Sequence, residues 1–312
     1  MSITYYIQSR LDSKLSQIQA FRPLPENIVK KLRDQFQIEM AYNSNAIEGN
    51  TLTLKETFLV INEGITIKGK SLQDHLEAKD QKTALEFVYS LVDQHQEVEI
   101  SQNLIRELQS LVITNSNKDL ARGYRTTSVT ITGSTHTPPE AISVPSEMAN
   151  LIQWYFQNLS RIHPIELAAI FHHKLVYIHP FSDGNGRTAR LIMNIILMQA
   201  GFPLTIILKN DRAKYYRALD KADSGNITPF VDFIARSVER SLDIYLKALE
   251  PQTSVSQSLI PLSILAKNSP YSAKYLNLLV NLGKLEAQKR GRNWVSSQEA
   301  LNNYISLISS RY

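Results

Sequence analysis

Apolar residues recur at helical spacing through most of this chain, and that periodicity restricts the fold more than any other feature. Between Pro25 and Gly49, four large apolar residues are spaced four apart and would form one stripe along a helix: Ile28, Leu32, Phe36 and Met40. Pro25 suits a helix start, and Gly49 suits a stop just beyond the last turn. Comparable segments continue as far as residue 250, so we expect a mainly α-helical fold.

Capping patterns mark the starts of the next helices. Thr53 and Glu56 match a capping box, and Gly64 can end the helix that they open. Ser71 and Ser101 hold the capping position before two further periodic segments. Further helices are expected over 148–159, 164–178, 188–200, 212–222 with Asp211 as its cap, and 229–250, which Pro251 stops.

One segment departs from helical spacing. Between Gly123 and Pro145, Val129 and Ile131 alternate with threonines, and a glycine and two prolines interrupt the run. Alternation bounded by such residues is typical of strands and turns. We therefore expect a short β-hairpin within the helical chain.

Composition sets limits on the class of protein. With 312 residues, 43% of them hydrophobic, the chain can form two or three domains with a sizeable core. It has no cysteine, which excludes disulfides and thiolate metal sites. No secretory signal or bilayer-length apolar stretch is present, so we expect a cytoplasmic protein without membrane contact. The net charge of +5 is compatible with a nucleotide or nucleic-acid partner but requires neither.

Chemically versatile residues concentrate in one stretch of twelve, HPFSDGNGRTAR, beginning at His179. Gly184 and Gly186 flank Asn185, so successive backbone N–H groups can point into one concavity where a helix begins. The helix start adds unpaired N–H groups and the positive end of its dipole. We call these three residues the anion cradle. The sequence predicts that the cradle holds phosphates.

Charged residues of the same stretch extend this site. Arg187 and Arg190 are three apart on the helix, share one face, and can each offer a fork of donors to phosphate. The carboxylate of Asp183 suits Mg²⁺ held together with phosphate oxygens. His179 can accept a proton near neutral pH. The combination indicates transfer from a nucleotide to a hydroxyl, without the GxxxxGK[ST] pattern of a P-loop.

The stretch resembles the Fic motif, HPFx[DE]GNGRxxR, at every fixed position. The resemblance covers roughly residues 25–250. It implies a Fic-type helical bundle with a β-hairpin flap, and a protein adenylyltransferase that moves AMP from ATP to a Ser, Thr or Tyr hydroxyl. Other family members transfer UMP, phosphocholine or a bare phosphate, and the intact GNGR favours AMP here.

The resemblance also implies roles for single residues. His179 would deprotonate the target hydroxyl, and Asp183 would hold Mg²⁺ between the α- and β-phosphates. The implied ATP-binding residues are Gly184, Asn185, Gly186, Arg187 at the β-phosphate, Thr188, Ala189, Arg190 at the γ-phosphate, Tyr215 and Tyr216 at the adenine, and Asp223. The flap, made of Thr130, Ile131, Thr132 and Gly133, would align an extended segment of the target protein by strand addition.

Two of these assignments have alternatives. Tyr215 and Tyr216 are neighbours on a helix and point in different directions, so a core position is as good an interpretation for one of them. Some relatives carry asparagine near the nucleotide where this chain has Asp223, which would bring an extra negative charge.

A second motif lies in the N-terminal helix. The stretch from Ser44 to Asn50, SNAIEGN, resembles the family's inhibitory motif, [ST]xxxE[GN]. Ser44 and Glu48 share a helix face, and Glu48 can pair with Arg190. An arginine so engaged cannot clamp the γ-phosphate, so the resemblance implies a self-inhibited enzyme. Some relatives use this glutamate to remove AMP again, and that alternative stays open.

The end of the chain changes in composition. The stretch 253–258 is small and polar and is expected to be a linker, and 259–312 has the order helix, turn, helix, basic hairpin that is typical of a winged helix. We expect an N-terminal helical region with the inhibitory motif at 1–95, the catalytic core at 96–250 and a winged-helix-like domain at 259–312. Basic residues of the last domain make a DNA-binding regulator the alternative function: Lys267, Lys274, Lys284, Lys289, Arg290 and Arg292.

A metal site and the oligomeric state have more than one interpretation from the sequence. His172 and His173 allow a metal site, but neighbours on a helix face different ways, which favours core or interface positions. A homodimer is compatible with the sequence, which does not specify the oligomeric state.

Overall fold

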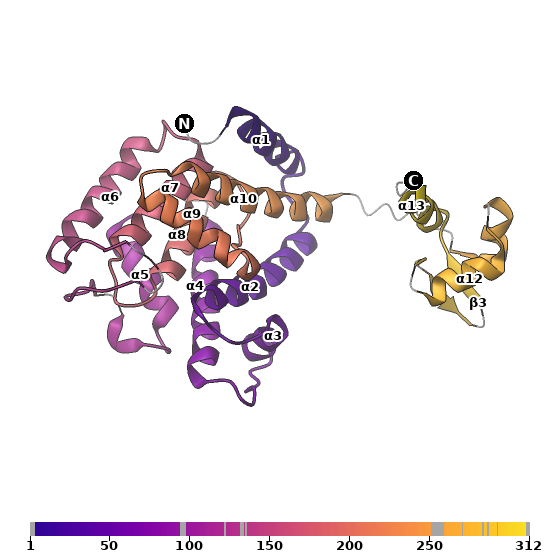
Figure 1. Cartoon of the computed structure of the whole chain (residues 1–312), viewed down its shortest axis with the longest axis horizontal. Coiled ribbons are helices and arrows are strands. Elements are labelled where there is room, and N and C mark those ends of the chain that lie inside the picture. Colours follow the sequence, from indigo (N-terminus) through magenta and orange to yellow (C-terminus); the bar gives the residue numbers. More distant parts are fainter. Residues whose placement is uncertain are drawn as a thin grey trace. The chain divides into compact units, whose positions relative to one another are not determined.

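The computed structural model describes residues 4–93, 98–121, 123–131, 134, 136–250, 259–269, 271–282, 284–285, 287–291 and 293–309 (Figure 1). The chain divides into two compact units, Met1–Leu249 and Glu250–Tyr312. The expected linker at 253–258, Pro251, and the flap residues Thr132 and Gly133 lie outside the described residues. The finer division into 1–95 and 96–250 stays a prediction.

The first unit is built from helices, as the periodicity predicts. They are α1 (Tyr5–Gln19), α2 (Glu26–Glu48), α3 (Leu54–Asn62), α4 (Leu72–Asp93), α5 (Gln102–Ile113), α6 (Val144–Asn158), α7 (Pro164–Ile178), α8 (Asn185–Gln199), α9 (Arg212–Asp223) and α10 (Thr228–Leu249). The sequence reasoning did not anticipate α1. Within the described ranges, none of the helices has the length and apolar character that crossing a bilayer requires.

Several helix ends form where the sequence places them. Gly49 ends α2 with φ 111°, a left-handed conformation that suits glycine. Thr53 and Glu56 form the complete capping box of α3. Ser71 and Ser101 accept backbone N–H groups at the starts of α4 and α5 at 3.0 and 3.2 Å.

The predicted cap of α9 is wrong. Asp211 lies at the capping position, but its side chain accepts no backbone N–H group of the helix. Its carboxylate instead accepts a hydrogen bond from the ammonium group of Lys214 at 2.8 Å. A charged partner one turn away competes with the backbone for the same oxygens.

Helix α8 forms the centre of the first unit. It packs against α7 most extensively and also contacts α2, α4 and α5. From Leu191 to Leu197 every residue is buried. A helix that is apolar all round is stable only in the interior, so the LIMNIILM segment buries α8 and fixes where its polar N-terminus points.

The first and last helices of the first unit lie against each other (Figure 1). Helix α1 packs against α10 through Leu11, Leu15 and Ile18, which are buried. Salt bridges flank this contact, from Arg10 and Lys14 to Glu239 at 2.8 and 2.7 Å.

The expected hairpin before α6 is absent from the described residues of 123–143. None of them is in a strand, and the N–H of Ser134 closes a turn onto the carbonyl of Ile131 at 3.1 Å. Pro138 and Pro139 have no N–H to donate to a ladder. The segment therefore lacks paired strands among its described residues.

The second unit has its own small core. It contains β1 (Ile260–Pro261), α11 (Leu262–Leu265), α12 (Ala273–Asn281), β2 (Gln288–Arg290), β3 (Asn293–Ser296) and α13 (Gln298–Ser309). The strands form an antiparallel sheet in the order β1-β3-β2, and Gly291 turns the β2–β3 hairpin with φ 61°. The basic hairpin expected here is present. The winged-helix assignment stays a prediction.

We expect Thr53→Ala to lower the free energy of unfolding by about 1 kcal/mol, because it removes one half of the capping box. The shift of the urea midpoint measures this. Thr4→Ala is a matched control, since Thr4 precedes α1 at the same position but makes no capping hydrogen bond. Equal shifts for both variants would contradict a stabilising role for the box.

Candidate active site

The first component of the site is His179, at the end of α7. It has φ 50° and ψ 57°, and among the described residues it is the one non-glycine residue with positive φ. Its N–H completes α7 by donating to Leu175 at 3.1 Å, and its Nδ1 lies 3.3 Å from the carbonyl oxygen of Val176. Burial lowers the pKa of His179, although the Val176 carbonyl and the Glu48 carboxylate oppose this. The neutral imidazole is favoured.

The loop after His179 is closed by one side chain. The amide of Asn185 accepts the N–H of Phe181 at 2.9 Å and donates to its carbonyl at 2.7 Å. The Phe181 ring is fully buried and anchors the loop in the core. Because the Asn185 side chain is committed to this loop, its contribution to the anion cradle is limited to the backbone N–H.

The cradle forms at the N-terminus of α8. Gly184 has φ 83°, and a Cβ there would lie 3.2 Å from methyl groups of Val112 and Ile113, so both conformation and space require glycine. At Gly186 a Cβ would overlap a carboxylate oxygen of Glu48. A negative charge therefore lies directly against the helix N-terminus, where the dipole and the unpaired N–H groups favour an anion.

The same carboxylate binds Arg190. The guanidinium donates to Glu48 Oε1 at 2.8 Å and to the hydroxyl and carbonyl oxygens of Ser44 at 3.0 and 2.9 Å. Arg190 is 1% exposed. Burial by itself would lower its pKa, but the nearby Glu48 carboxylate holds that pKa above its ordinary value. The ion pair that the resemblance of SNAIEGN to the inhibitory motif implies is present.

Arg187 and Asp183 form a second ion pair beside the cradle. Arg187 donates to Asp183 Oδ1 at 3.0 Å and to the carbonyl of Val112 at 3.1 Å. The other carboxylate oxygen of Asp183 lies 3.4 Å from the amide of Asn117, and its side chain remains 34% exposed. A partly exposed carboxylate next to the anion cradle fits Mg²⁺, because this ion takes few protein ligands and completes its coordination shell with substrate oxygens and water.

No larger metal site accompanies Asp183 in the part of the chain that the structure describes. No group of three or more histidines and acidic residues is placed to hold an ion there. His172 and His173 face different ways, as expected: His172 contacts the Tyr215 hydroxyl at 2.8 Å, and His173 contacts Asp223 at 2.9 Å.

Other residues of the expected ATP site lie at different depths. Tyr215 is 2% exposed and belongs to the core, whereas Tyr216 is only half-buried and stacks with Arg212 at 4.7 Å. Thr188 and Ala189 are fully buried, and the Thr188 hydroxyl has no hydrogen-bond partner among the described residues. The described flap residues, Thr130 and Ile131, lie exposed and half-buried.

Arg125 is a functional candidate that the sequence reasoning missed. Its guanidinium is 3% exposed and donates to the carbonyls of His179 at 2.8 Å, Thr127 at 3.1 Å and Pro139. Its backbone N–H donates to Pro180 at 2.9 Å. The Arg125 side chain thus joins the loop that begins at His179 to Thr127 and Pro139, which lie on either side of the flap. An isolated arginine before a threonine-rich extended run was the available signal.

Comparisons with known proteins agree with this geometry. A family model described as Fic/DOC family matches residues 99–197. A protein adenylyltransferase Fic from Nematostella vectensis is 42% identical over 219 residues, which is 70% of this chain and 51% of the relative. One from Drosophila erecta is 38% identical over 77% of this chain and 48% of its own length. The chain spans about half the length of these curated relatives.

Solved structures give the same result. A Fic domain containing signaling protein from Bacteroides thetaiotaomicron is 31% identical, with a TM-score of 0.70 over 77% of this chain and 95% of that one. Fic-1 from C. elegans is 34% identical, with a TM-score of 0.71 over 80% of this chain and 74% of its own. The chain belongs to the Fic/DOC family.

We expect Arg125→Met to lower the free energy of unfolding by about 3 kcal/mol, because it removes a buried guanidinium that donates to several carbonyls. Urea unfolding measures the change. Arg217→Met is the matched control, since Arg217 is exposed and donates to a single carbonyl. The control should change stability by less than about 0.5 kcal/mol. Equal stability of the two variants would contradict a stabilising role for the hydrogen bonds of Arg125.

Proposed function

We propose that this chain transfers AMP from ATP to a hydroxyl of a protein and that Glu48 restrains the reaction. One observation carries the proposal: a carboxylate, the side chain of Glu48, lies against Gly186 in the anion cradle and pairs with Arg190. A site that stabilises this negative charge is suited to phosphate oxygens at the same place. The relatives named protein adenylyltransferase Fic support the choice of AMP as the transferred group.

His179 is the proton acceptor in this proposal. The Val176 carbonyl can only accept a hydrogen bond, so we assign the ring hydrogen to Nδ1, which leaves the lone pair on Nε2 free. As the target oxygen bonds to the α-phosphorus, its proton passes to Nε2 and the bond to pyrophosphate breaks. A neutral imidazole is the form that burial favours.

The arginines and the helix N-terminus bind the triphosphate. The cradle N–H groups would receive phosphate oxygens, Arg187 the β-phosphate and Arg190 the γ-phosphate, where fixed charges stabilise the developing negative charge. Mg²⁺, when bound at Asp183 with phosphate oxygens, would supply further neutralisation of the pyrophosphate. Tyr216 is the better candidate of the two tyrosines for the adenine, because Tyr215 is buried.

Glu48 inhibits in two ways in this proposal. Its ion pair holds the Arg190 guanidinium that would bind the γ-phosphate, and its carboxylate lies in the space against Gly186. ATP that binds around it would be displaced from in-line geometry, and displacements of about 1 Å can cost on the order of 100-fold in rate. Since Glu48 belongs to this chain, no second protein is needed for inhibition.

The acceptor is a protein segment in extended conformation, aligned along the flap by backbone hydrogen bonds. The described flap segment lacks paired strands, so its backbone groups are free of a ladder that would compete with the target. Backbone pairing does not depend on side-chain identity, and the target protein therefore stays undefined.

Further assignments stay predictions. They are removal of AMP by the same site, transfer of another group, a homodimer, and contacts of 259–312 with DNA through a winged helix. The DNA-binding regulator is the less favoured function, because it depends on the basic residues of the second unit alone and the relatives are named for adenylyl transfer.

We expect Glu48→Gly to raise AMP transfer on the order of 100-fold, because it frees Arg190 and the space at Gly186. His179→Ala in the same background should abolish it. Labelled ATP and mass spectrometry of the modified protein measure the transfer and identify the adduct. Glu39→Gly weakens the same helix away from Arg190 and serves as control. If it activated equally, loss of helix stability would explain the effect.

The pH dependence tests the base. Protonation of His179 removes its free lone pair, and burial lowers the pKa of this histidine below the ordinary value of about 6.5. In Glu48→Gly, which also lacks the opposing carboxylate, the decline of transfer on the acid side should therefore be centred below about pH 6.5. Single-turnover rates across the acid range measure this. A decline centred above pH 6.5 would contradict the assignment.

A further inference from the structure

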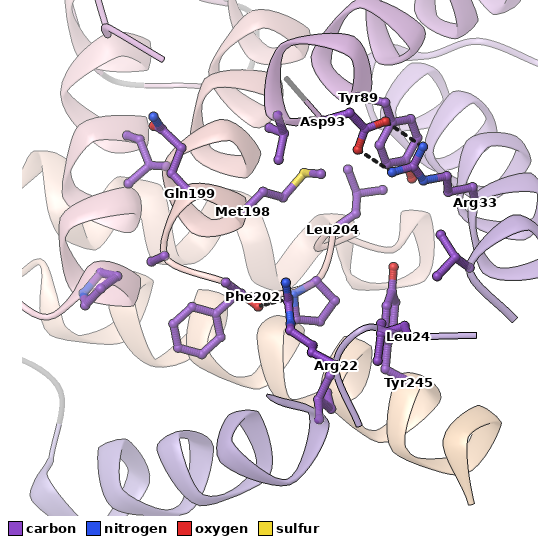
Figure 2. A pocket seen from close by; sticks show the side chains of 18 of the residues that line it. Arg22, Leu24, Arg33, Tyr89, Asp93, Met198, Gln199, Phe202, Leu204 and Tyr245 are labelled. Atoms are coloured by element: carbon purple, nitrogen blue, oxygen red, sulfur yellow. Dashed lines mark hydrogen bonds and ion pairs between the residues drawn. The ribbon is translucent and has the colours of Figure 1, made fainter. Parts of the chain in front are cut away.

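A cavity lies at the opposite end of α8 from the anion cradle. Its volume is about 850 Å³, and the C-terminal end of α8 and the segment after it form one wall, with Met198, Phe202 and Leu204 (Figure 2). The other walls come from α1, the α1–α2 connection, α2, α4, α6, α7 and α10. Because α8 has 15 residues, its length of about 22 Å separates this cavity from Gly184.

The lining is mainly apolar with a few polar groups at the edges. Leu24, Met198, Phe202 and Leu204 are among the apolar residues that line it (Figure 2). Small-molecule sites typically have volumes of about 300–1,000 Å³ and combine such a lining with a small number of placed polar groups. The cavity matches this description in size and composition.

Two arginines line the cavity, and only one is engaged by a carboxylate. Arg33 binds Asp93 through two hydrogen bonds and stacks over the Tyr89 ring at 4.9 Å. Arg22 is exposed, and in the described part of the chain its guanidinium donates to the carbonyl of Gly201 at 3.3 Å, without a carboxylate partner. Arg22 is therefore the positive charge available to a ligand.

Two tyrosines add hydroxyl donors. The Tyr89 hydroxyl is buried without a hydrogen-bond partner among the described residues, although the residue lines the cavity and is 9% exposed. Buried hydroxyls are nearly always paired, so an orphan in a cavity wall points to a missing oxygen or nitrogen. Figure 2 shows the Tyr245 hydroxyl directed into the same space. Burial raises the pKa of both phenols, which keeps them protonated as donors.

We propose that this cavity is a binding site for a small organic anion with an apolar body, such as an aryl or medium-chain carboxylate. The carboxylate of the ligand would bind Arg22 and accept a hydrogen bond from a tyrosine hydroxyl. The apolar body of the ligand would lie against Met198, Phe202 and Leu204. We expect a negatively charged ligand because the guanidinium of Arg22 has no carboxylate partner among the described residues. We expect a partly apolar ligand because much of the cavity wall is apolar. The site does not depend on the proposed AMP transfer.

The probe is 4-phenylbutyrate, compared with the neutral 4-phenylbutan-1-ol, which has the same body. Isothermal titration calorimetry on the full chain should give saturable one-site binding, with the acid bound about tenfold or more tightly than the alcohol. Arg22→Gln should remove this difference, and Arg217→Gln should preserve it. Equal affinity of acid and alcohol for the unaltered chain, or equal losses in both variants, would overturn the proposal.

A second measurement locates the probe. The chain has five methionines, of which Met198 lines the cavity. With ¹³C-methyl-labelled methionine, 4-phenylbutyrate should shift the Met198 resonance, assigned by Met198→Leu, and leave that of the core residue Met40 in place. His179→Ala should bind the probe like the unaltered chain, so failure of the transferase proposal would leave this result intact. An unshifted Met198 resonance at saturation would overturn the site.

Discussion

The burial of one charged side chain, Arg190, underlies the arrangement of the whole site. A guanidinium at 1% exposure is stable only if its surroundings supply acceptors, and α2 supplies them through Ser44 and Glu48. This contact fixes α2 against the polar start of α8 while the apolar remainder of α8 fills the core. The same contact delivers a carboxylate to the anion cradle. Packing and the proposed inhibition thus depend on a single ion pair.

His179, the proposed base, is held by different means. Its left-handed conformation turns the chain sharply out of α7, and the Asn185 amide and the Arg125 guanidinium fix the turn from two sides. Arg125 also binds Thr127 and Pro139 on either side of the flap, so the loop that carries the proposed base and the segment proposed to align the target share one donor. Such an arrangement would hold the proposed base and the flap in a fixed relation before a target binds.

The two ends of α8 differ in character. At the N-terminus, backbone N–H groups, two arginines and Asp183 make a polar site, which we propose binds phosphates. At the C-terminus, the apolar end of the helix and the loop after it face a mainly apolar cavity with Arg22 at its edge. The difference follows the sequence of α8 itself, which begins NGRTAR and continues LIMNIILM. Its polar start can face a ligand only because its apolar end is enclosed.

The sequence by itself determined the helices other than α1, most of their caps and the cradle, because spacing along a helix fixes which residues share a face. The pairing of Glu48 with Arg190 followed from the resemblance of SNAIEGN to the inhibitory motif. The sequence could not reveal Arg125, whose acceptors are carbonyls distant in the chain, since any residue provides a carbonyl. Nor could it separate Tyr215 from Tyr216, place Thr188 and Ala189 in the core, or detect the competition of Lys214 for Asp211. The expected hairpin failed among its described residues because alternation predicts an extended segment but not a partner strand. Tertiary structure decided these points, because burial and hydrogen-bond partners depend on which distant segments pack together.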